Sequence, residues 1–278
     1  MLIKRLATGV LVLALIVFSL LVLDSSIVVI TEYIIESAKI PLAFDGFKIV
    51  QISDFHDRKI SEYDDMSIAE QIANVEPDII VITGDLIDER TKNLDNIYAV
   101  FSELDAYPIY YENGNHDIRS PMYLDWLTMM DELGIVDVSG SKVTLTRGDD
   151  TISLIGIEQT YVDDVWGLDN EENAISGHIE PLISESDQFR LLLSHHPNFY
   201  QEASDLGIDM MLSGHFHGGH IQIFGWTPLN WFDPYYKGGS FDIEGMSLIV
   251  SKGVGDGFIP IRIGCDAEIV AITLNHSS

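Results

Sequence analysis

Five short segments of this sequence end an apolar run with aspartate, asparagine or histidine. They read FKIVQISDFHD, PDIIVITGD, YPIYYENGNHD, FRLLLSHH and IDMMLSGHFHGGH. Carboxylate oxygens, an amide oxygen and imidazole nitrogens form a donor set that suits Mn, Fe, Zn or Co, and it lacks the thiolates that structural zinc sites often use. The candidate metal ligands are Asp54, His56, Asp85, Asn115, His195, His215 and His217.

This donor set is too large for a single ion of that kind. If the carboxylate of Asp85 bridges two ions, the remaining residues can be shared between them. Two dications, two aspartates and one hydroxide held between the ions then sum to a charge of about +1. Such a centre attracts an anion, so the chemistry that these residues predict is attack on a phosphate ester.

The elements that must bring these residues together are predicted to be strands of an α/β fold. Each ligand-bearing segment begins as a buried strand, and amphipathic helical stretches alternate with the strands at residues 62–75, 94–104 and 122–133. Because the carboxyl ends of strands in an open α/β sheet face a shared crevice, we expect the five endings to converge. Glycines beside the ligands, such as Gly84 and Gly214, let the backbone turn sharply there.

The second half of the chain, from residue 142 onward, is richer in paired strand patterns. The segment RGDD at residues 147–150 is typical of a hairpin turn, so we expect a mixed sheet in this half. The β-branched segment SIVVITEYIIES, at residues 26–37, predicts a further strand near the start of the chain.

Composition limits the classes of partner. The chain has 278 residues and a formal charge of −29, and its acidic residues are spread along the sequence as expected for a solvated surface. Such a surface repels nucleic-acid phosphates, so nucleic acid is not expected as a partner, and an anionic substrate needs a local positive centre such as bound metal. The single cysteine, Cys265, excludes an intramolecular disulfide and a cysteine-based zinc site.

The N-terminal stretch from Leu6 to Leu23 carries no charge, and Lys4 and Arg5 stand directly before it. As a helix it would be about 27 Å long, close to the thickness of a bilayer's hydrocarbon core. Basic residues in front of a span favour an N-in orientation. We therefore predict a single-pass anchor in the cell membrane with the catalytic domain extracytoplasmic. A cleaved signal peptide is the alternative, although its apolar region is usually shorter and no A-x-A site follows here.

The sequence divides into three parts on this interpretation. Residues 1–24 form the membrane anchor, residues 25–44 a lead-in that contains a strand, and residues 45–278 one catalytic domain. There is no long linker, internal repeat or low-complexity tract.

The ligand-bearing segments resemble, as an ordered set, the motifs of the calcineurin-like metallophosphoesterases. The matching motifs are D-x-H at residues 54–56, G-D at 84–85, G-N-H-D at 114–117, a histidine after an apolar strand at 195, and G-H-x-H at 214–217. No single motif is specific, but all five occur in order between about residues 45 and 274. The first matching segment, GFKIVQISD, and the last, SKGVGDGFIPIRIGCDAEIVAITL, resemble those of a bacterial branch of the family that is often tethered to the membrane.

The resemblance implies a fold, a cofactor and residue roles. The fold would be a four-layer αββα sandwich of two mixed β-sheets flanked by helices, with two divalent metal ions at one edge of the sheets. The first ion would be held by Asp54, His56, Asp85 and His217, and the second by Asp85, Asn115, His195 and His215. His116 would protonate the leaving oxygen, and Asp117 would fix the orientation of His116.

Several positions leave alternatives open. Asp117 is also a candidate N-cap for a following helix, and His196 neighbours His195, which we prefer because it directly follows the strand serine. His178 and His276 lie outside the motifs and are interpreted as ordinary structural residues. His220 stands where the branch more often has glutamine, and the loop at residues 226–239 is unusually aromatic, which suits either packing or contact with lipid.

These observations predict a dinuclear-metal phosphoester hydrolase that acts at the outer face of the membrane, with a lipid headgroup or another envelope phosphoester as the first candidate substrate. The alternatives are an extracellular nucleotide phosphodiesterase or phosphatase, and a non-catalytic metal-binding interaction module. Monoester, diester and pyrophosphate substrates all fit the residues.

Overall fold

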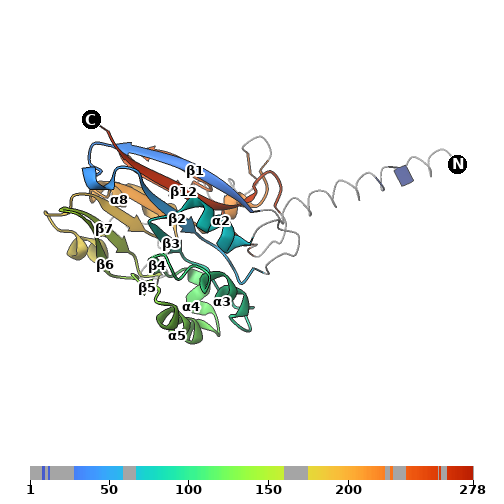
Figure 1. Cartoon of the computed structure of the whole chain (residues 1–278). Coiled ribbons are helices and arrows are strands. Elements are labelled where there is room, and N and C mark those ends of the chain that lie inside the picture. The colour runs from blue at the N-terminus through green and yellow to red at the C-terminus, as the bar shows by residue number, and fades with distance from the viewer. Residues whose placement is uncertain are drawn as a thin grey trace.

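Two mixed β-sheets packed face to face form the centre of the protein, and helices cover their outer faces (Figure 1). The computed structural model describes residues 8, 9, 12, 28–58, 67–159, 175–222, 226–227, 236–255, 257 and 262–277. This is the arrangement of two sheets flanked by helices that the sequence predicted.

The strands alternate with short helices along the described chain. Their bounds are β1 Val28–Ser37, η1 Leu42–Phe44, β2 Phe47–Ile52, α2 Ile68–Val75, β3 Ile79–Thr83, α3 Asp95–Phe101, β4 Ile109–Glu112, α4 Asn115–Arg119, α5 Tyr123–Leu133, β5 Val136–Asp137, β6 Lys142–Arg147, β7 Asp150–Gly156, α7 Ser176–Ile179, η2 Glu180–Leu182, β8 Arg190–Leu193, η3 Pro197–Phe199, α8 Tyr200–Asp205, β9 Met210–Ser213, η4 His217–Gly219, β10 Gly239–Ile243, β11 Met246–Val250 and β12 Ala267–His276.

The strand order places the five ligand-bearing strands at the middle of the two sheets. The first sheet has the order β1-β12-β2-β3-β4-β5, and the second has the order β10-β11-β9-β8-β7-β6. Strands β2, β3 and β4 are parallel to one another, and so are β8 and β9. Their carboxyl ends therefore point the same way within each sheet, as the convergence of ligands requires.

The strand predicted within the lead-in at residues 25–44 is β1, and it belongs to the first sheet. It pairs in parallel with β12 along its whole length, from Val28 opposite Ala267 to Ser37 opposite His276. A division at residue 44 therefore cuts through one sheet, and β1 is part of the folded domain. The hairpin predicted at residues 147–150 joins β6 to β7, as expected.

Three apolar layers hold the elements together. One layer lies between the two sheets and includes Ile49, Val81, Leu193 and Leu212. A second layer packs α7 and α8 on the outer face of the second sheet. The third packs α2, α3 and α5 on the outer face of the first sheet. Each large apolar side chain that is fully buried in such a layer contributes about 1.5–3 kcal/mol.

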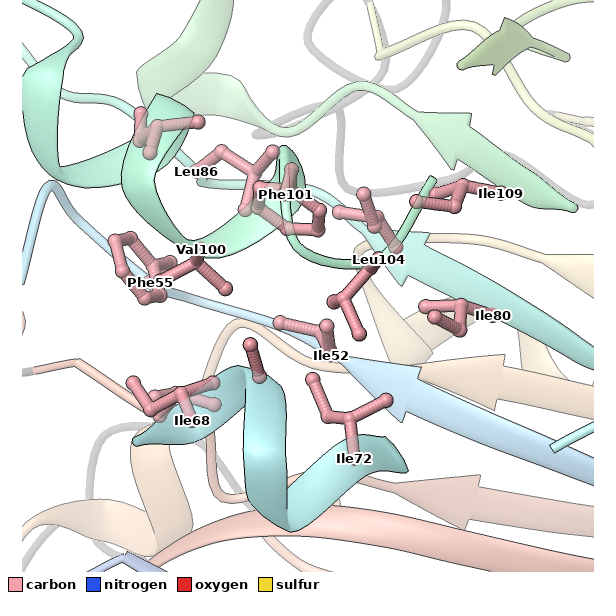
Figure 2. Packing of buried hydrophobic residues seen from close by; sticks show 14 of the residues in the cluster. Ile52, Phe55, Ile68, Ile72, Ile80, Leu86, Val100, Phe101, Leu104 and Ile109 are labelled. Atoms are coloured by element: carbon pink, nitrogen blue, oxygen red, sulfur yellow. The ribbon is translucent and has the colours of Figure 1, made fainter. Parts of the chain in front are cut away.

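The third layer also fixes the loops that follow β2 and β3. Figure 2 shows Phe55 and Leu86 among side chains of this layer, such as Ile68 of α2 and Val100 of α3. Phe55 lies between two candidate ligands in sequence, and Leu86 directly follows a third. Burial of these two side chains therefore holds their polar neighbours at the strand ends.

Helices α2, α3 and α5 lie within the three amphipathic stretches that the sequence predicted. Helix α2 begins after Ser67, whose hydroxyl accepts the Glu70 N–H at 3.1 Å, while the Glu70 carboxylate accepts the Ser67 N–H at 2.9 Å. This reciprocal cap sets the start of the helix. The earlier part of the predicted stretch, residues 62–66, lies outside the described residues.

Within the described residues, no helix combines the length and apolar character needed to cross a bilayer. The predicted anchor at residues 1–24 lies outside the described residues, apart from residues 8, 9 and 12.

Candidate metal centre

The predicted ligands converge at the carboxyl ends of five strands from both sheets. Asp54 and His56 follow β2, Asp85 follows β3, and Asn115 follows β4 as the first residue of α4. His195 follows β8 in the second sheet, and His215 and His217 follow β9. Three sets of these and neighbouring side chains have ligand atoms that all lie within 4.8 Å of one another.

The first set consists of Asp54, His56 and His217. The two imidazole Nε2 atoms of His56 and His217 are 3.1 Å apart. Nε2 of His217 lies 3.4 Å from Oδ1 of Asp54. Two imidazole nitrogens and a carboxylate oxygen come together here on buried side chains, and three protein ligands are the number that a catalytic zinc site uses.

The second set centres on Asp85 and His195, whose ligand atoms also lie within 4.8 Å of a carboxylate oxygen of Asp54. Nε2 of His195 is 3.1 Å from Asp85 Oδ2 and 3.2 Å from Nδ1 of His215. The same Asp85 Oδ2 lies 3.8 Å from Nε2 of His56, so it stands between the two sets. Oδ1 of Asn115 is buried and accepts no hydrogen bond among the described residues, which is costly unless a further partner binds there. A cation beside Asp85 would provide that partner.

The backbone at these residues is strained. Asp54, His56, Asp85, His215 and His217 all have positive φ, between 49° and 74°. Each non-glycine residue in the left-handed region costs about 1 kcal/mol or more, and such residues cluster at functional sites, where the surrounding structure holds them. The packing described above for Phe55 and Leu86 stabilises two of these loops against the strain.

Two glycines allow the ligand loops to approach one another closely. A Cβ atom at Gly114 would collide with the carboxylate of Asp85, and one at Gly214 would collide with Ser53 Oγ and the carboxylate of Asp54. Any larger residue at either position would push a ligand out of place. The sequence prediction that these glycines serve the site is supported by this close contact.

Hydrogen bonds orient the ligand atoms toward the centre. Nδ1 of His195 lies 2.9 Å from the Thr83 carbonyl oxygen, to which it can only donate, so Nε2 is the nitrogen that faces the centre. The His116 N–H donates to Asp85 Oδ1 at 2.8 Å, which leaves Oδ2 facing the two sets of ligands. Partners of this kind fix the tautomer of a ligand histidine and the rotation of a ligand carboxylate.

Burial keeps most of the imidazoles neutral, as metal ligands must be. It lowers the pKa of His56 to about 4 and that of His215 to about 3. Burial alone would also lower the pKa of His195, but the carboxylate of Asp85 raises it to about 10. Burial raises the pKa of Asp54 to about 6. The carboxylates thus need a positive charge nearby, which a proton on His195 supplies when no cation is bound.

His116 lies at the open side of the centre. Its imidazole, 36% exposed, stands edge-on to the ring of His56 with the ring centroids 5.2 Å apart. Its Nδ1 is 2.7 Å from Oε2 of Glu89, a residue that the sequence analysis did not single out. Glu89 follows the G-D motif in a loop without periodicity, so only its carboxylate type and its closeness to Asp85 in sequence could have indicated it.

The prediction that Asp117 orients His116 was wrong. Both carboxylate oxygens of Asp117 accept backbone N–H groups, from Asp85 at 2.7 Å, Gly114 at 2.8 Å and Ile87 at 2.9 Å. Asp117 therefore joins the loops after β3 and β4. It is the third residue of α4, whose N-cap is Gly114, so it is not the N-cap of a following helix, which was the alternative that the sequence left open. Its effect on His116 is indirect.

His178 and His276 lie away from the centre, as the sequence predicted, whereas His196 lies within it. His196 lies beyond the end of β8 and forms a set with His195 and His215, and its ring centroid is 3.8 Å from that of His215. It is thus a further candidate ligand. His178 is exposed on α7, and His276 Nδ1 lies 2.6 Å from the Ile40 carbonyl oxygen, away from the centre.

The comparison with protein families decides the class of this site. The model of the calcineurin-like phosphoesterases matches residues 47–219, which include the candidate ligands and His116. The chain belongs to this family. A Bacillus subtilis member named as the uncharacterized metallophosphoesterase YkuE is 31% identical over 265 residues, covering 89% of this chain and 86% of its own length. An uncharacterized metallophosphoesterase of Aquifex aeolicus is 29% identical, covering 87% of this chain and 90% of its own length.

A solved structure of a dimetal phosphatase from Danio rerio is also similar, with a TM-score of 0.44 and 14% identity, covering 75% of this chain and 88% of its own. As a calcineurin-like phosphoesterase, the chain is a hydrolase of phosphoesters. Its clustered aspartates and histidines are candidate binding groups for divalent metal.

Proposed function

We propose that this phosphoesterase works with two divalent ions, of the Mn, Fe, Zn or Co type, on either side of Asp85. Asp54, His56 and His217 would hold the first ion, and Asn115, His195 and His215 the second. The observation that carries the proposal is the position of Asp85 Oδ2, 3.1 Å from a nitrogen of one set and 3.8 Å from a nitrogen of the other. One carboxylate oxygen shared in this way suits a two-ion centre.

The reaction divides between the ions and the side chains. When bound, the ions supply positive charge for a phosphate group and lower the pKa of a water molecule. His116 is the proton donor, because its half-buried ring stands at the open side of the centre. Glu89 accepts the hydrogen bond from Nδ1, which leaves Nε2 to face the leaving oxygen. Water adds to phosphorus, the bond from phosphorus to that oxygen breaks, and the proton of His116 converts it to an alcohol.

The location that we propose rests on the N-terminal sequence. An uncharged stretch from Leu6 to Leu23 behind two basic residues favours a single-pass anchor with the phosphoesterase domain outside the cytoplasm. A phosphoester of the cell envelope, including a lipid headgroup, is the substrate class that this location supports. The formal charge of −29 disfavours nucleic acid.

The His116→Ala variant tests the assigned chemistry. The full chain, loaded with Mn²⁺, is assayed on phenyl phosphate, bis-nitrophenyl phosphate and nitrophenyl phosphate. Loss of a general acid costs about 10²- to 10⁴-fold, and most on the ester with the poorest leaving group, so turnover of phenyl phosphate should fall furthest. The metal content should stay at that of the wild type, because the His116 ring belongs to neither ligand set.

His178→Ala is the matched control, since that ring is exposed on α7. It should retain full activity. A His116→Ala variant with wild-type turnover of all three esters would refute the role of His116. Absence of hydrolysis by a wild-type chain that holds two ions would favour a non-catalytic metal-binding module.

A further inference from the structure

We propose that the metal centre faces the bilayer in which the N-terminal segment lies, so that its substrate is a phosphoester carried by a lipid or lipid-linked molecule of that same bilayer. This inference rests on the proposed function and adds to it the direction of the active site. The inference follows from strand β1, which connects the N-terminal segment to the first sheet. This strand begins at the end of that sheet where the metal centre lies.

Strand β1 begins at the end of the sheet that carries the metal centre. Val28 pairs with Ala267 in a parallel ladder, and β12 runs antiparallel to β2, with Val270 opposite Gln51. If this antiparallel register is continued from Val270 back to Ala267, Ala267 comes to lie beside the residues that follow β2, which include Asp54. In Figure 1, β1 begins at the end of the sheet opposite to the end at which β12 finishes.

Contacts between side chains and backbone agree with this register. The Glu268 N–H donates to the Gly253 carbonyl oxygen at 3.0 Å. A Cβ at Gly253 would lie 2.6 Å from Cβ of Asp54, so the two residues pack directly on one another. The Thr31 hydroxyl of β1 donates to Glu268 at 2.5 Å. A short path of contacts therefore joins the start of β1 to a candidate metal ligand.

The length of chain between the anchor and β1 keeps this end close to the membrane. Residues 24–27 separate Leu23 from Val28. Five Cα-to-Cα steps reach at most about 18 Å, whatever their conformation. The segment of Asp54 lies two strands away from β1, which is about 10 Å. Had β1 run the other way, the ten residues of the strand would have placed the centre about 30 Å farther from the anchor.

An exposed tryptophan lies at the same end. Thr227 Oγ1 donates to the Gly219 carbonyl oxygen at 3.2 Å, so this segment packs against the turn that follows His217. Its neighbour Trp226 is 44% exposed. Tryptophan is enriched at the membrane–water interface, where its ring sits at the level of the headgroups. This side chain is thus suited to contact the bilayer beside the centre.

Fluorescence quenching tests the orientation without using activity. The full chain is reconstituted in phosphatidylcholine vesicles that contain a lipid with a spin label on its headgroup. A fluorophore is attached at Trp226→Cys or, as the control, at Asp149→Cys in the exposed hairpin between β6 and β7, at the opposite end of the second sheet. The native Cys265 is buried and should label poorly. We expect at least two-fold quenching at position 226 and none at position 149. Equal quenching, none at either position, or stronger quenching at 149 would overturn the proposal.

A spacer tests the consequence for catalysis. Thirty Gly/Ser residues inserted between Ser26 and Ile27 release the domain from the bilayer, and the same spacer added after Ser278 is the control. The probes are soluble bis-nitrophenyl phosphate and a vesicle lipid with a nitrophenyl phosphodiester headgroup, so the leaving group is the same. In each case the bond from phosphorus to the nitrophenyl oxygen breaks, and nitrophenol is released.

The inserted spacer should lower hydrolysis of the lipid ester at least ten-fold and leave hydrolysis of the soluble ester unchanged. The C-terminal spacer should change neither rate. Equal rates on the lipid ester with and without the inserted spacer would contradict the orientation. A wild-type chain that hydrolyses neither ester would instead contradict the proposed function, while the quenching measurement would still report the orientation.

Discussion

The carboxylate of Asp85 lies close to both groups of candidate ligands. Its Oδ1 accepts the His116 N–H at 2.8 Å, while its Oδ2 stands between an imidazole of the first sheet and one of the second. Asp85 itself has a φ of 57°, in the left-handed region. The strain is maintained because Asp117 accepts the Asp85 N–H and because Leu86 is buried in the adjacent core.

Glu89 is predicted to position His116. Removal of its charge in Glu89→Gln leaves a weaker acceptor for Nδ1–H, so the imidazole should donate its proton less effectively. We expect turnover of phenyl phosphate to fall about ten-fold, and turnover of nitrophenyl phosphate, which has a better leaving group, to fall less. The measurement is kcat on both esters, together with metal content, which should not change.

Glu103→Gln removes a charge from an exposed carboxylate elsewhere and is the matched control. If Glu89→Gln lowers kcat equally for both esters, or lowers the metal content, Glu89 acts on the metal centre and not through His116.

At the scale of elements, the carboxyl ends of the strands determine the positions of the candidate ligands. The sequence predicts these ends well, because apolar runs such as those of β3 and β8 stop directly at polar residues. It also predicts which types of side chain meet, since parallel strands share one edge. The contact between Glu89 and His116 was missed because Glu89 lies in a loop, and a loop has no periodicity to reveal where its side chains point.

The place of β1 was missed for a different reason. Its strand pattern was visible in residues 26–37, but its partner begins at Ala267, near the other end of the chain. Pairing over such a separation depends on the whole topology, so a local pattern cannot show whether a strand leads into a domain or belongs to its sheet.

Gln51 links the two sheets beneath the centre. Its Nε2 donates to Thr83 Oγ1 at 2.8 Å in the first sheet and to the Ser213 carbonyl oxygen at 2.9 Å in the second. Gln51→Met keeps a similar volume and removes both donors. We expect the free energy of unfolding to fall by about 1–3 kcal/mol. The affinity for metal should also weaken, because Ser213 is followed directly by the His215 loop.

The matched control for Gln51→Met is Ile272→Met, a buried substitution in the same layer between the sheets that removes no hydrogen bond. Urea denaturation and titration with Mn²⁺ provide the two measurements. Wild-type metal affinity in Gln51→Met would show that the sheets keep their relative position without this link.

For the whole molecule, the two sheets act as the two sides of one site. The first sheet contributes Asp54, His56, Asp85 and Asn115, and the second contributes His195, His215 and His217. Neither sheet holds all of the candidate ligands, so we expect binding of metal and docking of the sheets to be coupled. The same end of the first sheet receives the chain from the N-terminal segment through β1.

The most direct test of this account is anomalous scattering from crystals of the Mn²⁺-loaded protein, combined with elemental analysis. We predict two ions per chain, about 3.5–4 Å apart on either side of Asp85 Oδ2. One should lie beside Asp54, His56 and His217, and the other beside Asn115, His195 and His215. A single ion, or an empty centre in protein supplied with excess Mn²⁺, would contradict the central claim.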